Sequence, residues 1–534
     1  MRHRFIPRDV FLTCFCLSIV NAQVSVVTYH NDNSRTGQNL KETILTHANV
    51  NVNSFGQLFA YAVDGQVYAQ PLYVPGVAIS GKGTHNVVFV ATQNDSVYAF
   101  DADSNAGANA APLWQAAFAN PAMGITAVTS DQVSCSDISP QIGITGTPVI
   151  DAASGTLYVV AKTAEVTGGV TKYYQRIHAL DITSGGEKFG GPFVIEASYP
   201  GTCSPNEGGR VVFSPLRQSQ RAGLALAGGV LFISFASHCD NNPYTGWVLA
   251  YNAKTGKKLG VFNTVPTHTY ECRAGIWQSG AAPAVDTSGN LFFATGNGPF
   301  NPNNAGGADY GDSQIKLAFS ETGFAVADYF TPYDQQNLEQ NDTDLGSGGV
   351  LLLPDQPGAN PHLLVNVGKE GSIYLVNRDN MGKYNSGGDS QIVQWLPDVL
   401  GGIWGMPAYF NESVYFGGSY DSLKAFTLTN GLFNPNPASH TPTPYAYYGP
   451  TPSVSANGTR NGIVWALDYA AQPSGGPAVL HAYSAANLGN ELYNTTQNAE
   501  RDQLGPAVKF SVPTIANGKV YVGTGNSVAV FGVL

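Results

Sequence analysis

The sequence predicts an all-β fold, an eight-bladed β-propeller of four-stranded antiparallel blades. Three observations support this prediction. The first is composition, because the 534 residues include 11% aromatic residues, 61 glycines and 32 prolines but only 12% charged residues. This mixture is typical of many short strands joined by turns. The second is that few segments repeat apolar residues every 3.6 positions, so helix cannot be the main element.

The third observation is an internal repeat. One phrase recurs eight times: a short β-rich strand, a turn of Gly, Asn or Asp, a strand of Val, Tyr and Phe, and a third strand. The clearest parts of the copies are Val87–Asp103, Thr147–Gly185, Gly223–Gly256, Ala281–Gly323, Leu345–Gly382, Gly405–Gly431, Thr451–Tyr469 and Ser511–Val533. Steps of 49 to 74 residues separate comparable positions in the copies, namely Phe89, Leu157, Leu231, Leu291, Leu363, Val414, Ile463 and Val520. A four-stranded blade needs about 40 to 50 residues, so the steps fit blades with inserted loops.

Turn chemistry and edge protection agree with this architecture. Pairs such as Asn94-Asp95, Ser154-Gly155 and Asn517-Gly518 separate strand-like runs, where hairpins need positive φ. Radial closure leaves only short sheet edges, whereas an open sheet of so many strands would expose long ones. We expect Gln57–Val63 to add an outer strand to the last blade and so to lock the ring. Two β-sandwiches are the rival all-β arrangement.

The first 22 residues are typical of a signal peptide. Three arginines precede the apolar run Val10–Val20, and small residues before Gln23 offer a cleavage site. The run is too short to span a bilayer; a buried N-terminal strand is the alternative. The sequence therefore predicts a signal peptide at residues 1–22, one propeller at residues 23–534, and a secreted or periplasmic protein.

Charge and cysteine content narrow the function classes. Residues 23–534 hold 23 basic and 36 acidic side chains, a net charge of −13, which argues against nucleic acid or an anionic membrane as partner. No later stretch is long and apolar enough for a membrane span. Four cysteines remain (Cys135, Cys203, Cys239, Cys272), without metal-ligand spacing. In an exported protein one or two disulfides are expected, and Cys239 with Cys272 is the first pairing we consider.

Several phrases, in order, resemble the quinoprotein dehydrogenases that use pyrroloquinoline quinone (PQQ). They are Asn31–Gly37 with Ala48-Asn49-Val50, Ser96–Asp101, Ala250–Gly256 with Thr264-Val265-Pro266, Ala294–Asn301, Phe330–Asp334 and Lys369–Asp379. The overall style is closest to uncharacterised bacterial PQQ-like repeat proteins. The resemblance covers the chain from about residue 29 to the C-terminus and implies an eight-bladed propeller with PQQ and calcium as cofactors.

The resemblance also implies roles for individual residues. Asp342 falls at the place of the catalytic base, and Asn297 at that of an oxygen ligand to calcium. Lys369 stands where a basic residue contacts the quinone, and Trp277 lies near the place of the indole on which the cofactor rests. Two further assignments are less regular. Asp240 is the only carboxylate near the place of a calcium-binding glutamate, and Ile403-Trp404 stands where an Asn-Trp pair is expected, so that Trp404 keeps the tryptophan of the pair.

The chain departs from the family pattern, and each residue has a structural alternative. The adjacent Cys-Cys pair of the family is absent, and the region offers Cys135-Ser136-Asp137 instead. Asn297 suits a tight turn and Asp342 a capped polar loop that could hold structural calcium. Trp277 suits a packed wall, Lys369 a solvated turn, and Asp240 the tip of a rigid loop.

The sequence is compatible with two functions, because propellers host both enzymes and binding modules. The first is a PQQ- and calcium-dependent dehydrogenase that oxidises a small alcohol or sugar. Without a haem attachment motif, such an enzyme would pass electrons to a separate acceptor. The second is a non-catalytic extracellular module that has lost the cofactor and binds a polysaccharide or a protein, or serves as a scaffold. The sequence contains no Gly-x-Ser-x-Gly elbow, phosphate loop or dinucleotide fingerprint.

Overall fold

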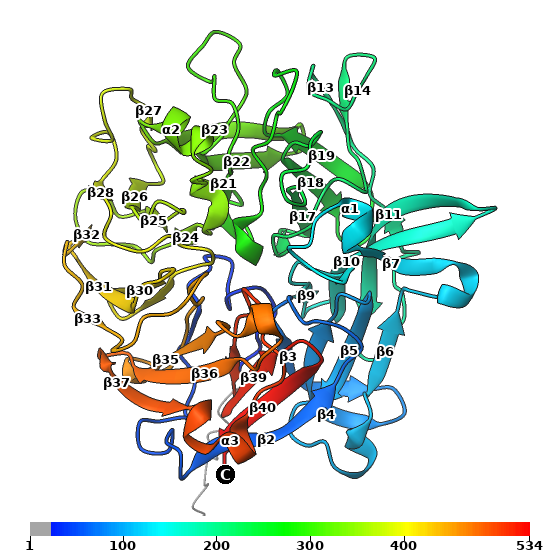
Figure 1. Ribbon diagram of the computed structural model, residues 1–534, viewed down its shortest axis with the longest axis vertical. Coiled ribbons are helices and arrows are strands. Elements are labelled where there is room, and N and C mark those ends of the chain that lie inside the picture. Colours follow the sequence, from blue (N-terminus) through cyan, green and yellow to red (C-terminus); the bar gives the residue numbers. More distant parts are fainter. Residues whose placement is uncertain (1–22) are drawn as a thin grey trace, which may run out of the picture.

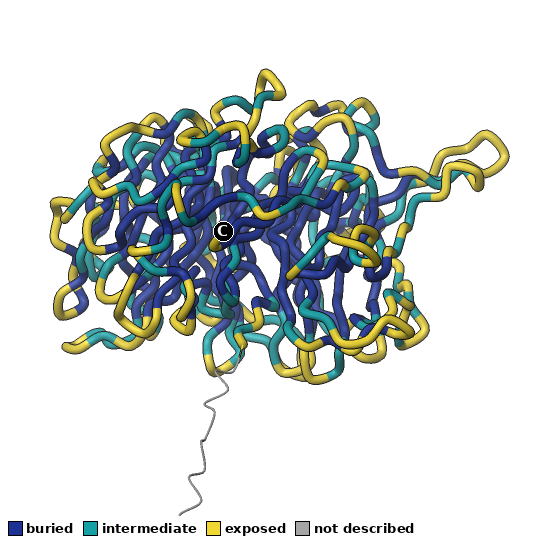
Figure 2. Tube along the Cα trace, turned by 90° about the horizontal axis from the view of Figure 1, so that it is seen from below, coloured by how far each residue is buried: buried dark blue, intermediate teal, exposed yellow. Residues whose placement is uncertain are grey.

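The computed structural model describes residues 23–534, so the predicted signal peptide lies outside the described residues. Sheets are arranged around a common centre (Figure 1), and the side view is a flattened disc with buried strands in its middle layer (Figure 2). The architecture is a β-propeller. No helix within residues 23–534 is long and apolar enough to cross a membrane. The helices are single turns or little more: η1 (Gly107–Ala110), η2 (Pro121–Met123), α1 (Ser130–Val133), η3 (Gln278–Gly280), α2 (Gln335–Gln340), η4 (Leu345–Ser347), η5 (Gln472–Ser474), η6 (Thr495–Asn498) and α3 (Ala499–Asp502).

Among these described residues, eight sheets have four or more strands. The first four along the chain contain, in turn, β3 (Leu72–Ile79), β4 (Gly83–Ala91), β5 (Ser96–Asp101) and β6 (Trp114–Ala117); β7 (Ile125–Thr129), β8 (Gln141–Ile142), β9 (Val149–Asp151), β10 (Thr156–Thr167), β11 (Val170–Asp181) and β12 (Phe193–Val194); β16 (Ala225–Ala227), β17 (Val230–Phe235), β18 (Trp247–Asn252) and β19 (Lys258–Asn263); and β20 (Ala284–Val285), β21 (Leu291–Ala294), β22 (Gln314–Ser320), β23 (Gly323–Thr331) and β27 (Lys383–Tyr384).

The other four follow in the second half of the chain. They contain β24 (Leu351–Leu352), β25 (Leu363–Asn366), β26 (Ile373–Asn377) and β28 (Gln394–Leu396); β29 (Ala408–Phe410), β30 (Ser413–Gly417), β31 (Leu423–Thr429), β32 (Leu432–Phe433) and β33 (Ser439–His440); β1 (Gln38–Asn39), β34 (Ser453–Asn457), β35 (Arg460–Asp468), β36 (Val479–Ser484) and β37 (Asn487–Asn494); and β2 (Phe55–Ala62), β38 (Thr514–Ala516), β39 (Lys519–Gly523) and β40 (Ser527–Val533). A small three-stranded sheet of β13 (Ser198–Pro200), β14 (Asn206–Glu207) and β15 (Arg210–Val212) lies outside this set.

The internal repeat matches these sheets. Its eight marker residues each fall in a different sheet, in β4, β10, β17, β21, β25, β30, β35 and β39. Most strand pairs are antiparallel; the short strands β1 and β27 instead pair parallel with β34 and β23. Turn chemistry therefore located the hairpins correctly, because the positive-φ positions include Asp95, Gly155 and Gly518.

The two ends of the described chain meet in one sheet, as the sequence predicts. Strand β2, near the N-terminus, pairs antiparallel with the C-terminal strand β40 at the edge of the sheet. Phe55 at the start of β2 is fully buried and packs on Trp465 of the neighbouring sheet, with ring centroids 5.4 Å apart. Burying a phenylalanine side chain contributes about 1.5–3 kcal/mol, so this closure adds apolar packing to the strand pairing.

One N-terminal segment, residues 26–39, connects the inner strands of all eight sheets. Its backbone or side chains hydrogen-bond to residues of β3, β9, β16, β20, β24, β29, β34 and β38, namely Tyr73, Ile150, Leu226, Val285, Leu352, Tyr409, Val454 and Ile515. Each bond satisfies a polar backbone group that a closed ring would otherwise bury unpaired. The segment therefore acts as a hub for the ring.

Arg35 anchors this hub. Its side chain is fully buried. The guanidinium donates to the Pro283 carbonyl from Nε and Nη2, at 3.1 and 2.8 Å, and from Nη1 to Thr28 Oγ1 and to the Tyr29 and Asp32 carbonyls at 2.8–3.0 Å. The motif Asn31–Gly37, which carried part of the resemblance, thus has a structural role in this chain.

Candidate active site

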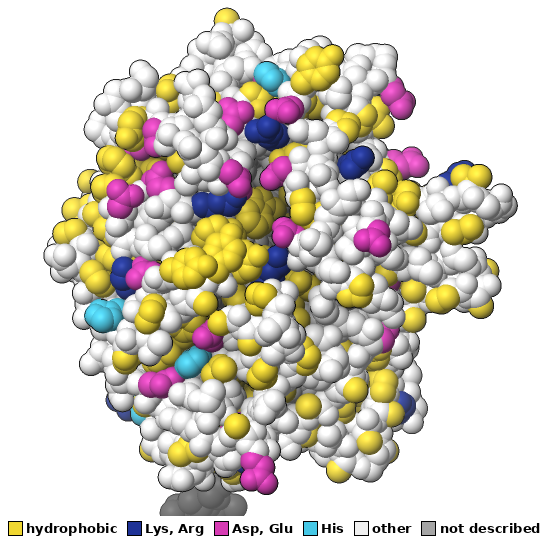
Figure 3. Space-filling model, viewed as in Figure 1, with side chains coloured by type: hydrophobic (Ala, Val, Ile, Leu, Met, Phe, Trp, Pro, Cys, Tyr) yellow, Lys and Arg dark blue, Asp and Glu magenta, His cyan; other side chains and the backbone are white. Residues whose placement is uncertain are grey.

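Loops that follow or precede strands of several sheets line one pocket with a cavity volume of about 260 Å³. The lining residues lie in the segments 135–138, 219–221, 236–240, 296–297, 342–344, 447–448 and 509–510, together with Tyr244, Gly275, Trp277, Lys369 and Trp404. On the face viewed in Figure 3, a hollow near the centre has hydrophobic side chains beside it and both basic and acidic groups around it. This mixture of aromatic walls and a few charged groups is typical of a small-molecule site.

An amide and two carboxylates form the centre of the pocket. The Asn297 backbone NH donates to Asp344 Oδ1 at 2.7 Å, and the Asn297 side-chain Nδ2 donates to Asp342 Oδ1, also at 2.7 Å. Gly296 allows this approach, because a Cβ there would lie 2.8 Å from Asp344 Oδ1. The Asn297 side-chain oxygen is buried without a hydrogen-bond partner among the described residues, which is unusual for a buried polar atom.

Lys369 joins the two carboxylates. Its Nζ lies 2.9 Å from Asp342 Oδ1 and 2.9 Å from Asp344 Oδ2, and 5.8 Å from the ring centroid of Trp277. Burial lowers the pKa of Lys369, but Asp344 and Asp342 outweigh burial and raise this pKa above its ordinary value. Burial likewise raises the pKa of Asp344, against the opposing effect of Lys369. Lys369 therefore stays protonated, and its charge lies against the carboxyl groups of both aspartates.

A third carboxylate, Asp240, lies on the loop after β17. Its Oδ1 accepts hydrogen bonds from Tyr244 Oη at 2.6 Å and from Ser237 Oγ at 3.0 Å. The adjacent Cys239 forms a disulfide with Cys135, which fixes this loop to the segment after α1. Both cysteines line the pocket, so a disulfide forms part of its wall.

A buried lysine–histidine pair, Lys162 and His238, lies at the same loop. His238 lines the pocket and its Nε2 accepts a hydrogen bond from Lys162 Nζ at 2.6 Å. Lys162 Nζ also donates to the Leu216 and Gln218 carbonyls at 2.9 and 3.2 Å. Burial lowers the pKa of Lys162 to about 7, and burial together with Lys162 holds the pKa of His238 well below its usual value. His238 is therefore a neutral pocket residue.

Comparisons with known proteins reveal the fold but no close relative. No family model matches the sequence, and no curated protein matches it. Solved structures do match: a quinohemoprotein alcohol dehydrogenase from Pseudomonas putida HK5 at 12% identity and TM-score 0.62, covering 95% of this chain and 80% of that one. A europium-containing methanol dehydrogenase matches at 12% identity and TM-score 0.60, covering 95% and 98%. A quinohemoprotein alcohol dehydrogenase from Comamonas testosteroni matches at 14% and 0.58, covering 95% and 80%.

The chain has the quinoprotein alcohol dehydrogenase-like β-propeller fold. This confirms the resemblance that the sequence phrases suggested, at the level of fold. In this quinoprotein-like propeller, the six residues singled out from the sequence all line the same pocket: Asp240, Trp277, Asn297, Asp342, Lys369 and Trp404. Their convergence is a geometric finding, and their roles remain predictions.

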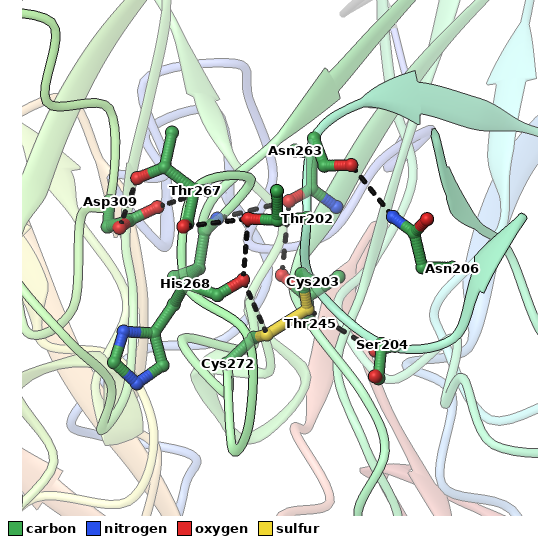
Figure 4. The surroundings of a disulfide bond; sticks show 12 residues. Thr202, Cys203, Ser204, Asn206, Thr245, Asn263, Thr267, His268, Cys272 and Asp309 are labelled. Atoms are coloured by element: carbon green, nitrogen blue, oxygen red, sulfur yellow. Dashed lines mark hydrogen bonds between the residues drawn. A yellow bond between two sulfur atoms is a disulfide. The ribbon is translucent and has the colours of Figure 1, made fainter. Parts of the chain in front are cut away.

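The suggested disulfide pairing was wrong. Cys239 pairs with Cys135, and Cys272 pairs with Cys203, with Cα–Cα distances of 5.6 and 6.1 Å. The expectation of one or two disulfides was correct. Figure 4 shows the second disulfide among hydrogen bonds from Thr202 to the carbonyls of Thr267 and His268, at 2.8 and 3.2 Å. Cys272 lies in the loop after β19, and the sequence could not show that this loop packs against residues 201–206.

Sequence reasoning missed Asp344 as a site residue. Its side chain is 8% exposed, whereas that of Asp342 is 68% exposed. The available signal was position, because Asp344 directly precedes the apolar and glycine-rich run Leu345–Leu353, which leads into the buried strand β24. Arg221, Tyr244 and Lys509 also line the pocket and were not singled out.

Proposed function

We propose that this protein is a PQQ- and calcium-dependent dehydrogenase that oxidises an alcohol or sugar in the pocket described above. The observation that carries the proposal is the convergence of the six sequence-selected residues on one pocket. The fold of the alcohol and methanol dehydrogenases named above supports it. We further propose that the eight large sheets are eight blades, each contacted by the hub segment.

The oxygen donors in the pocket are of the types that suit a hard cation. Calcium prefers carboxylate and amide oxygens, and the pocket offers the unpartnered Asn297 Oδ1 with the carboxylates of Asp240, Asp342 and Asp344. An unpartnered buried amide oxygen is explained most simply by a ligand that it coordinates. We assign Asn297 and Asp240 as metal ligands, and add Asp344 as a third candidate.

The remaining lining fits a flat, anionic cofactor. Trp277 and Trp404 supply aromatic surfaces, and Lys369, Arg221 and Lys509 supply positive charge. The Cys135–Cys239 disulfide provides a wall where the sequence lacks an adjacent cysteine pair. When bound, PQQ would supply the hydride-accepting quinone, and electrons would then leave to a separate acceptor.

Asp342 has the properties of the base in this scheme. Its exposed side chain is accessible to a substrate hydroxyl, and the hydrogen bonds that it accepts from Asn297 Nδ2 and Lys369 Nζ both use Oδ1. Oδ2 therefore remains available to accept the hydroxyl proton. Lys369 holds the carboxylate in place and stabilises its charge before that transfer.

The test is reconstitution of the purified protein with PQQ and Ca²⁺. We expect a retained quinone absorbance, a rise in Tm with Ca²⁺, and reduction of an artificial electron acceptor with ethanol or D-glucose. Asp342→Asn should abolish dye reduction while keeping the Ca²⁺-dependent rise, whereas Glu207→Gln, on the distant strand β14, should change neither. Absence of cofactor retention at micromolar PQQ would refute the proposal and favour the non-catalytic binding module.

Location follows the same proposal. Two disulfides require an oxidising compartment, and the periplasm or the cell exterior supplies one. We therefore propose a secreted or periplasmic protein, which detection of the mature chain in a periplasmic or culture-medium fraction would test.

A further inference from the structure

A group of tyrosines lies at one side of the pocket and is not used by the scheme above. We define the aromatic shelf as Tyr447 and Tyr448, which line the pocket, together with Tyr420, which stacks on Tyr447 beyond the lining residues. Tyr447 and Tyr448 have ring centroids 4.0 Å apart, and Tyr420 stacks on Tyr447 at 5.9 Å with an interplanar angle of 25°. Trp404 supports the shelf edge-on, 5.0 Å from Tyr447. Hydrophobic side chains gather beside the central hollow on this face (Figure 3).

Two of the three shelf tyrosines are exposed to solvent. Tyr420 is 77% exposed and Tyr447 43% exposed. Within residues 23–534, neither hydroxyl group hydrogen-bonds to another protein atom. Tyr420 in particular leaves most of its surface in solvent, so packing within the fold does not explain its place on the stack.

The backbone at Tyr420 gives an independent sign of function. Tyr420 lies in the β30–β31 turn with φ of +52°. A bulky residue in the left-handed region is strained, and glycine or asparagine would adopt it at lower cost. Strained residues of this kind concentrate at ligand sites. The chain thus keeps an exposed tyrosine where conformation favours glycine.

Charged groups flank the shelf. Lys509 Nζ lies 5.0 Å from the Tyr448 ring centroid and donates to Tyr448 Oη at 3.3 Å. The exposed Asp137 lies 3.5 Å from Lys509 Nζ. Donors and acceptors therefore border an aromatic plane. A pyranose ring has the complementary pattern, since one face presents C–H groups and the rim presents hydroxyl groups.

We propose that the aromatic shelf binds a pyranose ring, so that the ligand of the pocket is a sugar and not a short alcohol. As a statement about substrate, this rests on the proposed function; as a statement about binding, it does not require a cofactor. A two-carbon alcohol would leave the shelf uncovered, whereas a sugar covers the rings and reaches Asp137 and Lys509 with its hydroxyl groups.

The experiment is saturation-transfer difference NMR on the full mature chain without added cofactor, with D-glucose, maltotriose, cellotriose, benzyl alcohol and ethanol as probes. We expect saturation of pyranose ring protons for at least one sugar. Tyr420→Gly should weaken the affinity for that sugar by about 3- to 10-fold, the range for loss of one aromatic contact. The Tm should be unchanged or raised, because the backbone strain at this position is relieved. Tyr270→Ala is the matched control, since Tyr270 is also 77% exposed, whereas only Tyr420 of the two stacks on Tyr447 of the shelf.

The outcomes separate this inference from the proposed function. Binding of no sugar, an unchanged affinity in Tyr420→Gly, or saturation of benzyl alcohol alone would overturn the sugar assignment. Dye reduction with ethanol and no sugar binding would refute this inference and leave the dehydrogenase standing. Shelf-dependent sugar binding without cofactor retention would support the sugar site and refute the dehydrogenase.

Discussion

The two disulfides close loops of similar length in different places. Replacing both cysteines of either disulfide with serine should therefore cost a similar free energy of unfolding, while only one of the two replacements should loosen the pocket. Cys135–Cys239 spans 104 residues and Cys203–Cys272 spans 69. In the chain-entropy model, closing these loops stabilises the fold by about 4.7 and about 4.4 kcal/mol, and measured values are commonly about 2–4 kcal/mol. We therefore expect the two double-serine variants to lose similar stability.

Their local effects should differ. Only Cys135–Cys239 lines the pocket. Its loss leaves the loop of Asp240 tied to the segment after α1 through Asn241, whose Nδ2 donates to the Val133 and Ser134 carbonyls at 3.0 and 2.9 Å. The Cys203–Cys272 region keeps the Thr202 bonds of Figure 4, and Asp309 accepts from Thr267 NH at 2.8 Å.

Urea unfolding without reductant measures the loss of stability, and amide hydrogen exchange by mass spectrometry measures the local effect on each region. In the Cys135→Ser/Cys239→Ser variant, peptides covering residues 130–138 and 236–244 should exchange faster. In the Cys203→Ser/Cys272→Ser variant, the change should be confined to residues 198–213 and 264–274. Faster exchange of the pocket peptides in the second variant, or none in the first, would refute this reasoning.

Two further variants test buried charges. Arg35→Met should lower the free energy of unfolding by about 3 kcal/mol or more, because it leaves buried carbonyls without donors at about 1–3 kcal/mol each, whereas the exposed Arg460→Met should change it by less than about 0.5 kcal/mol; equal losses in urea unfolding would contradict the hub role. Burial lowers the pKa of Lys162 to about 7, from 10.5 for a lysine in water. Between those pH values the unfolded chain binds a proton that the folded chain does not, so this lysine makes the free energy of unfolding rise with pH by up to about 1.4 kcal/mol per pH unit. Below pH 7 the lysine is protonated in both states, so the free-energy cost of burying its charge no longer changes with pH. Unfolding free energies at pH 7.5, 8.25 and 9 should therefore rise less steeply in Lys162→Met than in the wild type, while the exposed Lys254→Met should keep the wild-type slope; parallel slopes in all three proteins would show that Lys162 does not titrate in this range.

Local sequence signals were sufficient for the repeat and for the closure of the ring. Hairpin turns are determined by a few residues, so Asn94-Asp95 and Asn517-Gly518 located their strands without tertiary information. The β2–β40 pair followed from the need to cover the last sheet edge. Convergence of the site residues followed from their positions at strand ends, where the loops of a radial array gather.

Tertiary properties were not accessible in this way. Disulfide pairing depends on how long loops lie against each other, and the spacing of Cys203, Cys239 and Cys272 does not encode this. The hub contacts of residues 26–39 join partners up to hundreds of positions apart. The burial of Lys162 against His238 also joins two sheets, and no local pattern around either residue indicates it.

The two aspartates of the Asp342-Thr343-Asp344 motif show why residue type alone could not assign the site. Asp344 is enclosed, accepts the Asn297 backbone NH and pairs with Lys369, so its carboxyl group is held rigidly. Asp342 shares Lys369 through a single oxygen and remains mostly exposed. A base must reach the substrate proton, and a ligand or positioning group must be held rigidly. The environments of these two carboxylates therefore favour Asp342 for proton transfer and Asp344 for holding Lys369 and the loop of Asn297 in register.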